Sequence, residues 1–353
     1  MDYNYFTPTG ELIKEYLLEK GISQKELATR LNISEKHISN FLSGKIHLTE
    51  EMAIKLEFIF NDIPASYWLN YESKYREFLA KKGFDLNLKQ SNIREIAKKF
   101  KFKEIFPKNC ELDILAQAKE VLKLLSISSF ENFDNSYNNI PVEFFQDGGE
   151  KESIVIWIKL CEKLVNEQNK IDEKAKFSLK NLRDNLHKFK NIALNSNIQE
   201  SMNTCRKLCN KLGIYLVIRE PISNSKVRGV LTTYNNRPAI FLSGRYKTHD
   251  HIWFAFIHEI KHLLDDYNKK EVYVSFDDID KLSEKEIKAH EYARDYFINP
   301  VDYKKFINEK NFDSTSLERF AKSQNVNIGM LIGRLQHDGF ISNSSYNYKK
   351  NRM

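Results

Sequence analysis

The chain has 353 residues, of which 41% are hydrophobic and 29% are charged, with a formal net charge of +7. This length favours two or three domains, the composition excludes a mainly disordered chain, and the positive charge mildly indicates a polyanionic partner. No apolar run reaches the roughly 18 residues of a membrane span, no signal sequence opens the chain, and the four cysteines form no CxxC pair. We therefore expect a cytoplasmic protein with no membrane partner and no disulfide framework.

The first predicted elements are short helices between residues 8 and 79. Ser23 is placed to cap QKELATRLN, Ser34 to cap EKHISNFLSG, and Thr49 to cap EEMAIKLEFIF. Two short helices joined by a tight turn at Asn32-Ile33 are typical of a helix-turn-helix motif. A small helical bundle with a solvated, charged face has the same periodicity.

In a helix-turn-helix motif, the second helix enters the major groove, and residues at the ends of both helices approach phosphates. The predicted DNA contacts are Gln24, Ser34, Lys36, His37, Ser39, Asn40 and Lys45. Glu35 would also face the groove, where its carboxylate repels phosphate. It can accept a hydrogen bond from a cytosine amino group, or favour the positive end of the helix dipole.

Residues 8–75, from PTGELIKEYLLEKG to ASYWLNYESKY, resemble the helix-turn-helix domain of the HigA-type antitoxins within the XRE class. The resemblance implies a sequence-specific repressor, often dimeric and autoregulatory. Its expected partners are a double-stranded DNA operator and a second copy of the chain.

The middle of the chain has helical periodicity without a chemical motif. CELDILAQAKEVLKLLSI and SIVIWIKLCEKLV have strong apolar stripes, whereas NFDNSYNN and Gly148-Gly149 predict loops. We expect a helical linker or middle domain that packs its neighbours together.

The pattern then changes from helical to alternating. GIYLVIRE, RGVLTTYN and PAIFLS predict strands, with a turn at Asn235-Asn236. PAIFLS is either an ordinary sheet strand or one that binds an extended peptide by strand addition.

The next run, HDHIWFAFIHEIKHLLDD, predicts an apolar helix that carries an HExxH motif. His258 and His262 lie four residues apart and therefore on one face, which suits two imidazole ligands of one Zn²⁺ ion. Glu259 stays near enough to act as a general base toward water. The same five-residue motif also arises by chance, in an ordinary core helix or in a sheet-and-helix scaffold without metal. The downstream helix SEKEIKAHEYARDYFINP offers a third ligand.

Residues 211–340 resemble the ImmA/IrrE-type metallopeptidases. The matching segments are PAIFLSGRYKTHDHIWFAFIHEIKHLL, the E-x-x-A-x-x-Y-A pattern that starts at Glu286, FINP and VNIGMLIGRLQHDG. The resemblance implies a zincin-like domain with a small sheet beside the HExxH helix. It also implies that His258, His262 and Glu286 bind zinc and that Glu259 is the catalytic base.

The chain departs from this family at two positions. Lys261 replaces a small residue, and we expect it to face solvent. His290 replaces Asn. It either contacts and orients a zinc ligand without binding the ion itself, or is an exposed histidine. Glu291 is an alternative third ligand. The candidate donors for the oxyanion formed in hydrolysis are Tyr246, Tyr292 and His337.

Together these patterns predict an α+β protein with an all-α helix-turn-helix domain (1–82), a helical middle region (83–210) and a metallopeptidase domain (211–353). The predicted function is a DNA-binding transcriptional regulator whose zinc-dependent endopeptidase cleaves a repressor, a partner or the chain itself. The alternative is a HigA-like antitoxin or repressor whose C-terminal domain senses a ligand or binds a toxin without proteolysis.

Overall fold

The computed structural model describes residues 6–138, 149–170, 175–245, 248–265, 267–268, 272–276 and 284–350. The chain divides into two compact units, Met1–Ile93 and Arg94–Met353. The sequence-based boundaries after residues 82 and 210 stay predictions, and residues 94–210 are grouped with the sheet. Within the described ranges, no helix is long and apolar enough to cross a bilayer.

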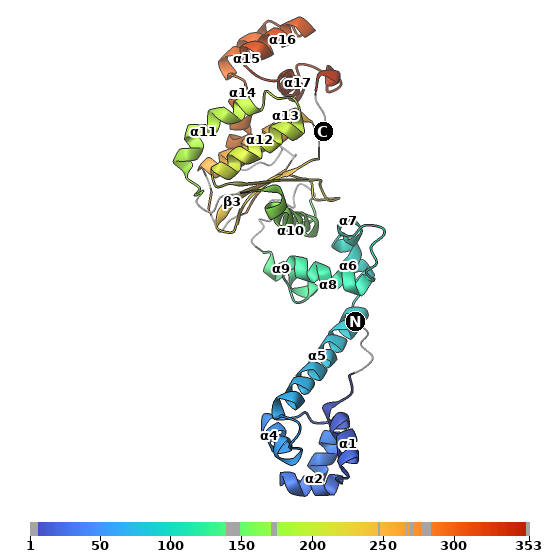
Figure 1. Cartoon of the computed structure of the whole chain (residues 1–353). Helices are drawn as coiled ribbons and strands as arrows, with labels where there is room; N and C mark the ends of the chain where they lie inside the picture. Colours follow the sequence, from blue (N-terminus) through green and yellow to red (C-terminus); the bar gives the residue numbers. More distant parts are fainter. Residues whose placement is uncertain are drawn as a thin grey trace. The chain divides into compact units, whose positions relative to one another are not determined.

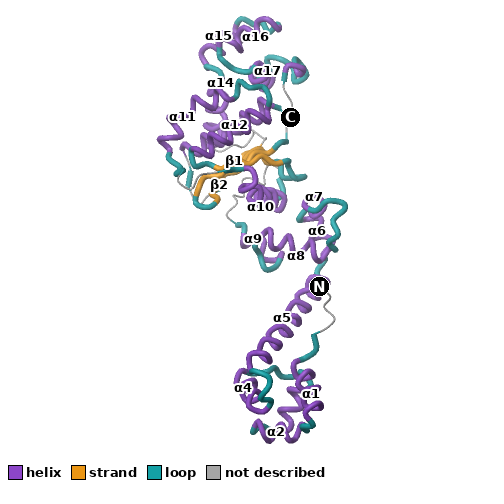
Figure 2. Tube along the Cα trace, in the orientation of Figure 1, coloured by secondary structure: helices purple, strands orange, loops and turns teal. Residues whose placement is uncertain are grey.

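The N-terminal unit contains a bundle of short helices followed by a long one (Figures 1 and 2). Its helices are α1 (Thr9–Lys20), α2 (Gln24–Leu31), α3 (Glu35–Leu42), α4 (Glu50–Ile59) and α5 (Ala65–Gln90). The hydroxyl oxygens of Ser23, Ser34 and Thr49 accept hydrogen bonds from the backbone N–H three residues later, at 3.1, 3.2 and 3.2 Å. These caps satisfy otherwise unpaired donors, so the predicted helix starts are confirmed.

The core of this unit joins the short helices to the start of α5. Leu27, Ile38 and Leu56 are fully buried between them. Trp68 of α5 is buried against them, and the Tyr16 ring meets it edge-on at 5.9 Å between centroids. This apolar packing holds α2 and α3 at a fixed angle, which a DNA-binding motif requires.

The C-terminal unit contains a sheet and many helices. Its first helices are α6 (Ile93–Lys99, starting at the unit boundary), α7 (Phe102–Ile105), α8 (Ile114–Leu125), η1 (Phe130–Asn132), α9 (Phe133–Ser136), α10 (Lys151–Gln168), α11 (Leu179–Ile192) and α12 (Ile198–Lys211). Its later helices are α13 (His249–Asp265), α14 (Glu284–Phe297), α15 (Pro300–Asn308), α16 (Ser314–Ser323), α17 (Ile328–His337) and η3 (Asn347–Lys349).

The predicted loop at NFDNSYNN is wrong over residues 132–136, where η1 ends and α9 follows. Phe133 is buried, and its ring meets Phe100 edge-on at 5.0 Å between centroids. Burial of this aromatic ring outweighs the loop preference of the neighbouring Asn, Asp and Ser residues. Of the predicted Gly148-Gly149 loop, Gly148 lies outside the described residues, and Gly149 lies in neither a helix nor a strand.

The sheet has the strand order β1-β3-β2-β4, with β1 (Tyr215–Arg219), β2 (Val227–Tyr234), β3 (Arg237–Ser243) and β4 (Tyr273–Phe276). The pair β1–β3 is parallel, and the pairs β2–β3 and β2–β4 are antiparallel. The predicted turn between β2 and β3 is confirmed: Asn235 and Asn236 have φ of 45° and 62°, as a tight hairpin turn requires. The fourth strand was not predicted, because four residues are too few for alternation to stand out.

Helices cover both faces of the sheet (Figure 1). The helix α10 packs on one face, where the buried Trp157 ring donates its N–H to the Glu220 carbonyl oxygen at 3.1 Å. The helices α12 and α13 pack on the other face. The two cysteines of α12, Cys205 and Cys209, are buried free thiols of this core.

Candidate functional site

The HExxH side chains lie on α13, the helix packed over β2 and β3. His258 and His262 are each 1% exposed, and Glu259 is fully buried. The apolar spacing that buries α13 therefore also removes these three polar side chains from bulk water. Buried polar groups need partners, and the two histidines find theirs on α14.

Glu286 of α14 reaches both histidines. Its carboxylate oxygens lie 3.0 Å from Nε2 of His258 and 2.9 Å from Nε2 of His262, and the two Nε2 atoms are 3.0 Å apart. Burial raises the pKa of Glu286, but hydrogen bonds from the two imidazoles outweigh burial and lower it. Burial is also the main reason why the pKa of His258 is lowered. A carboxylate and two imidazoles that meet at one point could hold a metal ion, and their ligand atoms all lie within 4.8 Å of one another.

Glu259 lies against the backbone of β2 at Gly229. A β-carbon at position 229 would overlap the Glu259 carboxylate, so only glycine leaves room for it. The close approach restricts where the carboxylate can lie. Sequence analysis missed Gly229, because nothing local distinguishes a strand glycine that faces a helix side chain.

The neighbouring residues of α14 and α13 resolve the alternatives left by the sequence. Glu291 is exposed, whereas Glu286 meets both histidines. His290 is half-buried and packs edge-on against His258, with 4.6 Å between ring centroids, so it is not an exposed histidine. Lys261 is half-buried: its ammonium pairs with the exposed Asp265 at 2.7 Å and lies over the Tyr292 ring.

Among the predicted oxyanion donors, His337 lies near enough to the cluster for its charge to contribute to lowering the pKa of His290, which packs against His258. Tyr246 lies outside the described residues. Tyr292 lies six positions after Glu286, off the face of α14 that carries it, and contacts Lys261 instead. His337 is exposed and lies 3.2 Å from an Asp338 carboxylate oxygen.

The strand PAIFLS is β3, which pairs with β1 on one side and with β2 on the other. Both of its edges are occupied, so it cannot bind a peptide by strand addition. The interpretation of PAIFLS as an ordinary sheet strand is correct.

The other candidate surface is the outer face of α2 and α3. The predicted DNA contacts Gln24, Ser34, Lys36, His37, Ser39 and Lys45 are exposed, and Asn40 is half-buried. The Ser34 hydroxyl oxygen caps α3 by accepting one hydrogen bond, which leaves its O–H donor and one lone pair for DNA. Opposite this face, Ile38, Phe41 and Leu42 are buried in the bundle.

Comparisons with known proteins support a helix-turn-helix motif in the N-terminal unit. The family described as "Helix-turn-helix" matches residues 13–68. The uncharacterized HTH-type transcriptional regulator YddM of Escherichia coli (strain K12) is 36% identical over 78 residues, which cover 22% of this chain and 82% of the relative. The chain belongs to the helix-turn-helix transcriptional regulators. Its helix-turn-helix domain is of the XRE type, and such a domain binds double-stranded DNA.

The surroundings of the C-terminal cluster of this regulator include an arginine that the sequence did not indicate. The guanidinium carbon of Arg228 lies 5.6 Å from the centroid of the Phe254 ring. Phe254 in turn lies beside His290, with 5.5 Å between ring centroids. Burial, followed by electrostatic effects of His258 and Arg228, lowers the pKa of His290 to about 3.

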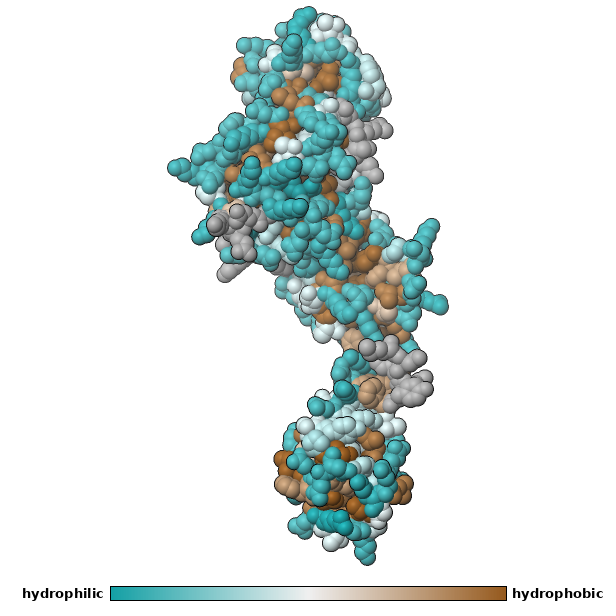
Figure 3. Space-filling model, viewed as in Figure 1, coloured by the Kyte–Doolittle hydropathy of each residue, from teal (hydrophilic) through white to brown (hydrophobic). Residues whose placement is uncertain are grey.

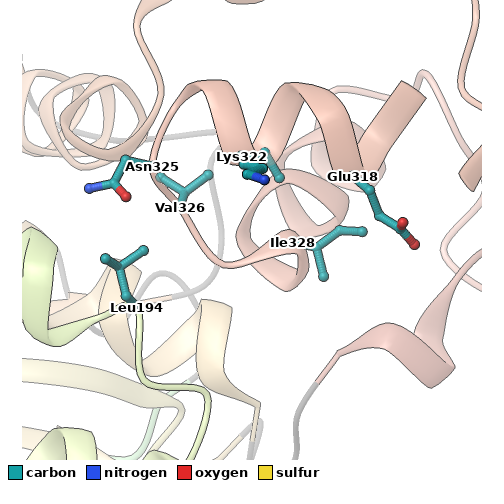
Figure 4. Close-up of a pocket in the computed structure, with 7 residues that line it drawn as sticks. Leu194, Glu318, Lys322, Asn325, Val326 and Ile328 are labelled. Carbon is teal, nitrogen blue, oxygen red and sulfur yellow. The ribbon is translucent and has the colours of Figure 1, made fainter. Parts of the chain in front are cut away.

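A shallow pocket of about 290 Å³ lies elsewhere in the C-terminal unit of the regulator, between the loop before α12 and the helices α16 and α17 (Figure 4). Its lining residues are Leu194, Glu318, Ala321, Lys322, Asn325, Val326 and Ile328. Glu318 already pairs with Lys349 at 2.5 Å. The pocket shares no residue with the HExxH cluster, and no chemistry is assigned to it.

Proposed function

We propose that this transcriptional regulator carries a zinc-dependent endopeptidase of the ImmA/IrrE type, with a zincin-like fold, in its C-terminal unit. The proposal rests on the convergence of His258, His262 and Glu286 beside Glu259. A tetrahedral zinc ion with bonds of about 2.0–2.1 Å needs ligand atoms roughly 3.3–3.4 Å apart. Here the two Nε2 atoms are 3.0 Å apart, and each lies 2.9–3.0 Å from a different oxygen of Glu286, so a small outward movement of the side chains would fit the ion.

Each residue of the cluster has a role in peptide hydrolysis. Zinc, when bound, supplies Lewis acidity, and the three protein ligands leave one position of a tetrahedral site open. The Glu259 carboxylate accepts a proton from the attacking water and returns it to the leaving amine. Burial of the cluster excludes bulk water, which strengthens these electrostatic interactions.

The substrate in this proposal is a repressor, a partner protein or the chain itself. The DNA-binding unit ends at Ile93 and the candidate peptidase begins beyond it in the same chain. Cleavage between the two units would separate DNA binding from the rest of the protein. Proteolysis would then switch off repression without any change in the helix-turn-helix motif.

The DNA-binding unit acts, in this proposal, as a homodimer on a palindromic operator. Its surface carries exposed apolar side chains: Leu18 on α1 is 77% exposed, and Ile54 and Phe58 on α4 are 50% and 74% exposed. Ile54 and Phe58 lie four residues apart on one face of α4. Apolar patches on this unit are visible in Figure 3. A second copy of the unit would cover such a patch, and two-fold symmetry would place two α3 helices on successive half-sites.

The burial of the cluster favours a second candidate function. Because His258, Glu259 and His262 are almost completely buried, a polypeptide substrate has to gain access to them. A HigA-like antitoxin or repressor whose C-terminal unit senses a small ligand, or binds a toxin, needs no such access.

Elemental analysis and a cleavage assay separate the two functions. Purified wild type should hold about one zinc per chain, and the His258→Ala, His262→Ala double variant should hold none. Glu259→Gln should keep its zinc. It should also lose at least about 100-fold in the rate at which it cleaves a proteome-derived peptide library, read by mass spectrometry.

Absence of zinc from the wild type would overturn the peptidase proposal. Zinc in the wild type with no cleavage of the library or of the chain itself would favour the sensor or antitoxin. Equal cleavage by wild type and Glu259→Gln would remove Glu259 as the base. Glu291→Gln is the matched control, because Glu291 is an exposed glutamate near the cluster, and it should retain full activity.

A further inference from the structure

Arg228 and Gly229 are consecutive residues of β2, yet both contact α13. Gly229 lies against the Glu259 carboxylate, and the Arg228 guanidinium lies over the Phe254 ring. In a regular strand, consecutive side chains point to opposite faces of the sheet. A local irregularity must therefore turn one of these residues toward α13.

The irregularity is a β-bulge in the pairing of β2 with β4. Val227 pairs with Phe276 and Gly229 pairs with Ser275, so the register with β4 skips Arg228. An extra residue of this kind bends the strand and re-aims its side chain, and bulges are frequent next to active sites. The bulge explains why Arg228 shares a face of the sheet with Gly229.

One aromatic ring, Phe254, separates the re-aimed guanidinium from the proposed metal ligand His258. Phe254, over which it lies, has its ring centroid 6.4 Å from that of His258 and 5.5 Å from that of His290. The guanidinium and the two histidine rings therefore surround the same Phe254 side chain.

We infer that Arg228 binds an anionic oxygen of the substrate at the HExxH cluster, an inference that rests on the proposed peptidase function. Guanidinium is always charged and offers a planar fork of donors that suits carboxylates and tetrahedral oxyanions. The sequence predicted no donor on β2, whereas Arg228 of this strand lies over Phe254, the ring beside His258 and His290. The anionic oxygen has two sources: a carboxylate of the substrate, or the oxyanion of the attacked carbonyl.

The oxyanion, the second of these two sources, forms during the hydrolytic step itself. The water oxygen forms a bond to the carbonyl carbon, and the π electrons of the carbonyl move onto its oxygen. Glu259 takes the proton that the water loses. The new negative charge then lies on an oxygen that a preorganised donor can stabilise.

Two small anions test this inference on the full-length protein. Methylphosphonate imitates a tetrahedral oxyanion, and acetate imitates a substrate carboxylate. Both are titrated by calorimetry into wild type, Arg228→Gln and Arg228→Lys, with the zinc content and thermal unfolding of each protein measured in parallel. Arg237→Gln is the matched control, because it removes a half-buried arginine from the far end of the β2–β3 hairpin.

Arg228→Gln should weaken binding of at least one anion by tenfold or more, without loss of zinc or thermal stability. Arg228→Lys, which keeps the charge but not the fork, should lie between wild type and Arg228→Gln. A selective loss for methylphosphonate identifies the oxyanion as the source, and a selective loss for acetate identifies a substrate carboxylate.

Equal affinities of wild type and Arg228→Gln for both anions would overturn the inference, and so would a wild type that binds neither. A merely structural Arg228 would lower the thermal midpoint and leave the anion affinities unchanged. Zinc content decides the peptidase proposal separately. A zinc-free protein that binds methylphosphonate through Arg228 would overturn that proposal and still support Arg228 as the anion-binding residue.

Discussion

Gly229 is the residue of β2 that leaves room for the Glu259 side chain, because a β-carbon there would overlap the carboxylate. Gly229→Ala should therefore displace either the strand or the carboxylate. Overpacking of this kind costs about 1–3 kcal/mol. We expect a lower thermal midpoint for the C-terminal unit in calorimetry, together with weaker cleavage, because the base is moved.

Gly83→Ala is the control for this substitution. Gly83 lies within α5, and a β-carbon there would meet no atom within 4 Å. Alanine in a helix interior gains about 0.5–1 kcal/mol over glycine. An unchanged or more stable Gly229→Ala protein with full activity would show that the strand gives way without cost, and that Glu259 needs no such close fit.

Glu286 and Glu291 are both carboxylates of α14, but only Glu286 meets the two histidines. Glu286→Ala should lower zinc occupancy strongly, because two imidazoles alone leave the ion without its only anionic ligand. Glu291→Ala should leave occupancy unchanged. Elemental analysis of both variants measures the difference, and the reverse result would reassign the third ligand to Glu291.

At the scale of elements, α3 is the part of the regulator that we expect to read the operator. Lys36 is exposed and Asn40 is half-buried on its outer face. Each specific base contact contributes roughly 1–3 kcal/mol of discrimination. Lys36→Ala combined with Asn40→Ala should therefore abolish preference for a DNA fragment that the wild type selects from a random pool, with zinc content unchanged.

Fluorescence anisotropy at several salt concentrations measures this prediction. Wild-type affinity should fall steeply as salt rises, because phosphate contacts release counterions. Lys14→Ala is the control, since Lys14 is an exposed lysine of α1 outside the motif. A flat salt response, or retained selectivity in the double variant, would contradict the assignment of α3 as the recognition helix.

Elements were predictable where local chemistry decides them. Ser23, Ser34 and Thr49 cap the expected helices, because a side-chain oxygen and the N–H three residues later need no tertiary partner. The hairpin turn at Asn235-Asn236 is equally local. The helix α9 was missed because burial of Phe133, a tertiary effect, outweighs the polar residues around it.

The candidate site was predictable only along α13 and α14. The four-residue spacing places His258 and His262 on one helix face, and the family resemblance pointed to Glu286. Arg228 and Gly229 were not found, because their positions depend on a bulge against β4, a strand too short to predict. Pairing register between strands, and the residue that a register skips, cannot be read from one strand alone.

At the scale of the whole molecule, the end of the described chain is tied to the start of the HExxH helix. Lys350 follows η3, and its ammonium lies 2.6 Å from the Asp250 carboxylate in the first turn of α13. Their side chains are 8% and 10% exposed. The same ammonium donates to the Gln336 side-chain oxygen of α17 at 3.1 Å. One buried ion pair therefore joins three segments of the C-terminal unit.

Removal of one partner of a buried ion pair leaves the other charge without compensation. Lys350→Ala should therefore destabilise the C-terminal unit by about 3 kcal/mol, measured as a lower midpoint for its thermal transition in calorimetry at pH 7. The control is Lys350→Met combined with Asp250→Asn, which removes both charges and should recover part of the loss. An unchanged midpoint in Lys350→Ala would show that this chain end contributes no stability.

The stability difference between wild type and Lys350→Ala should depend on pH, and the pKa of Asp250 sets the direction of this dependence. Burial raises the pKa of Asp250, but its hydrogen bond with His251 and the charge of Lys350 outweigh burial and lower the pKa from 3.8 to about 2. A lowered carboxyl pKa contributes stability that is complete above the unfolded pKa of 3.8 and is lost as pH falls through about 2. The stability difference between wild type and Lys350→Ala should therefore be constant from pH 7 to pH 5 and shrink below pH 4, and a difference independent of pH would remove Asp250 as the partner that matters.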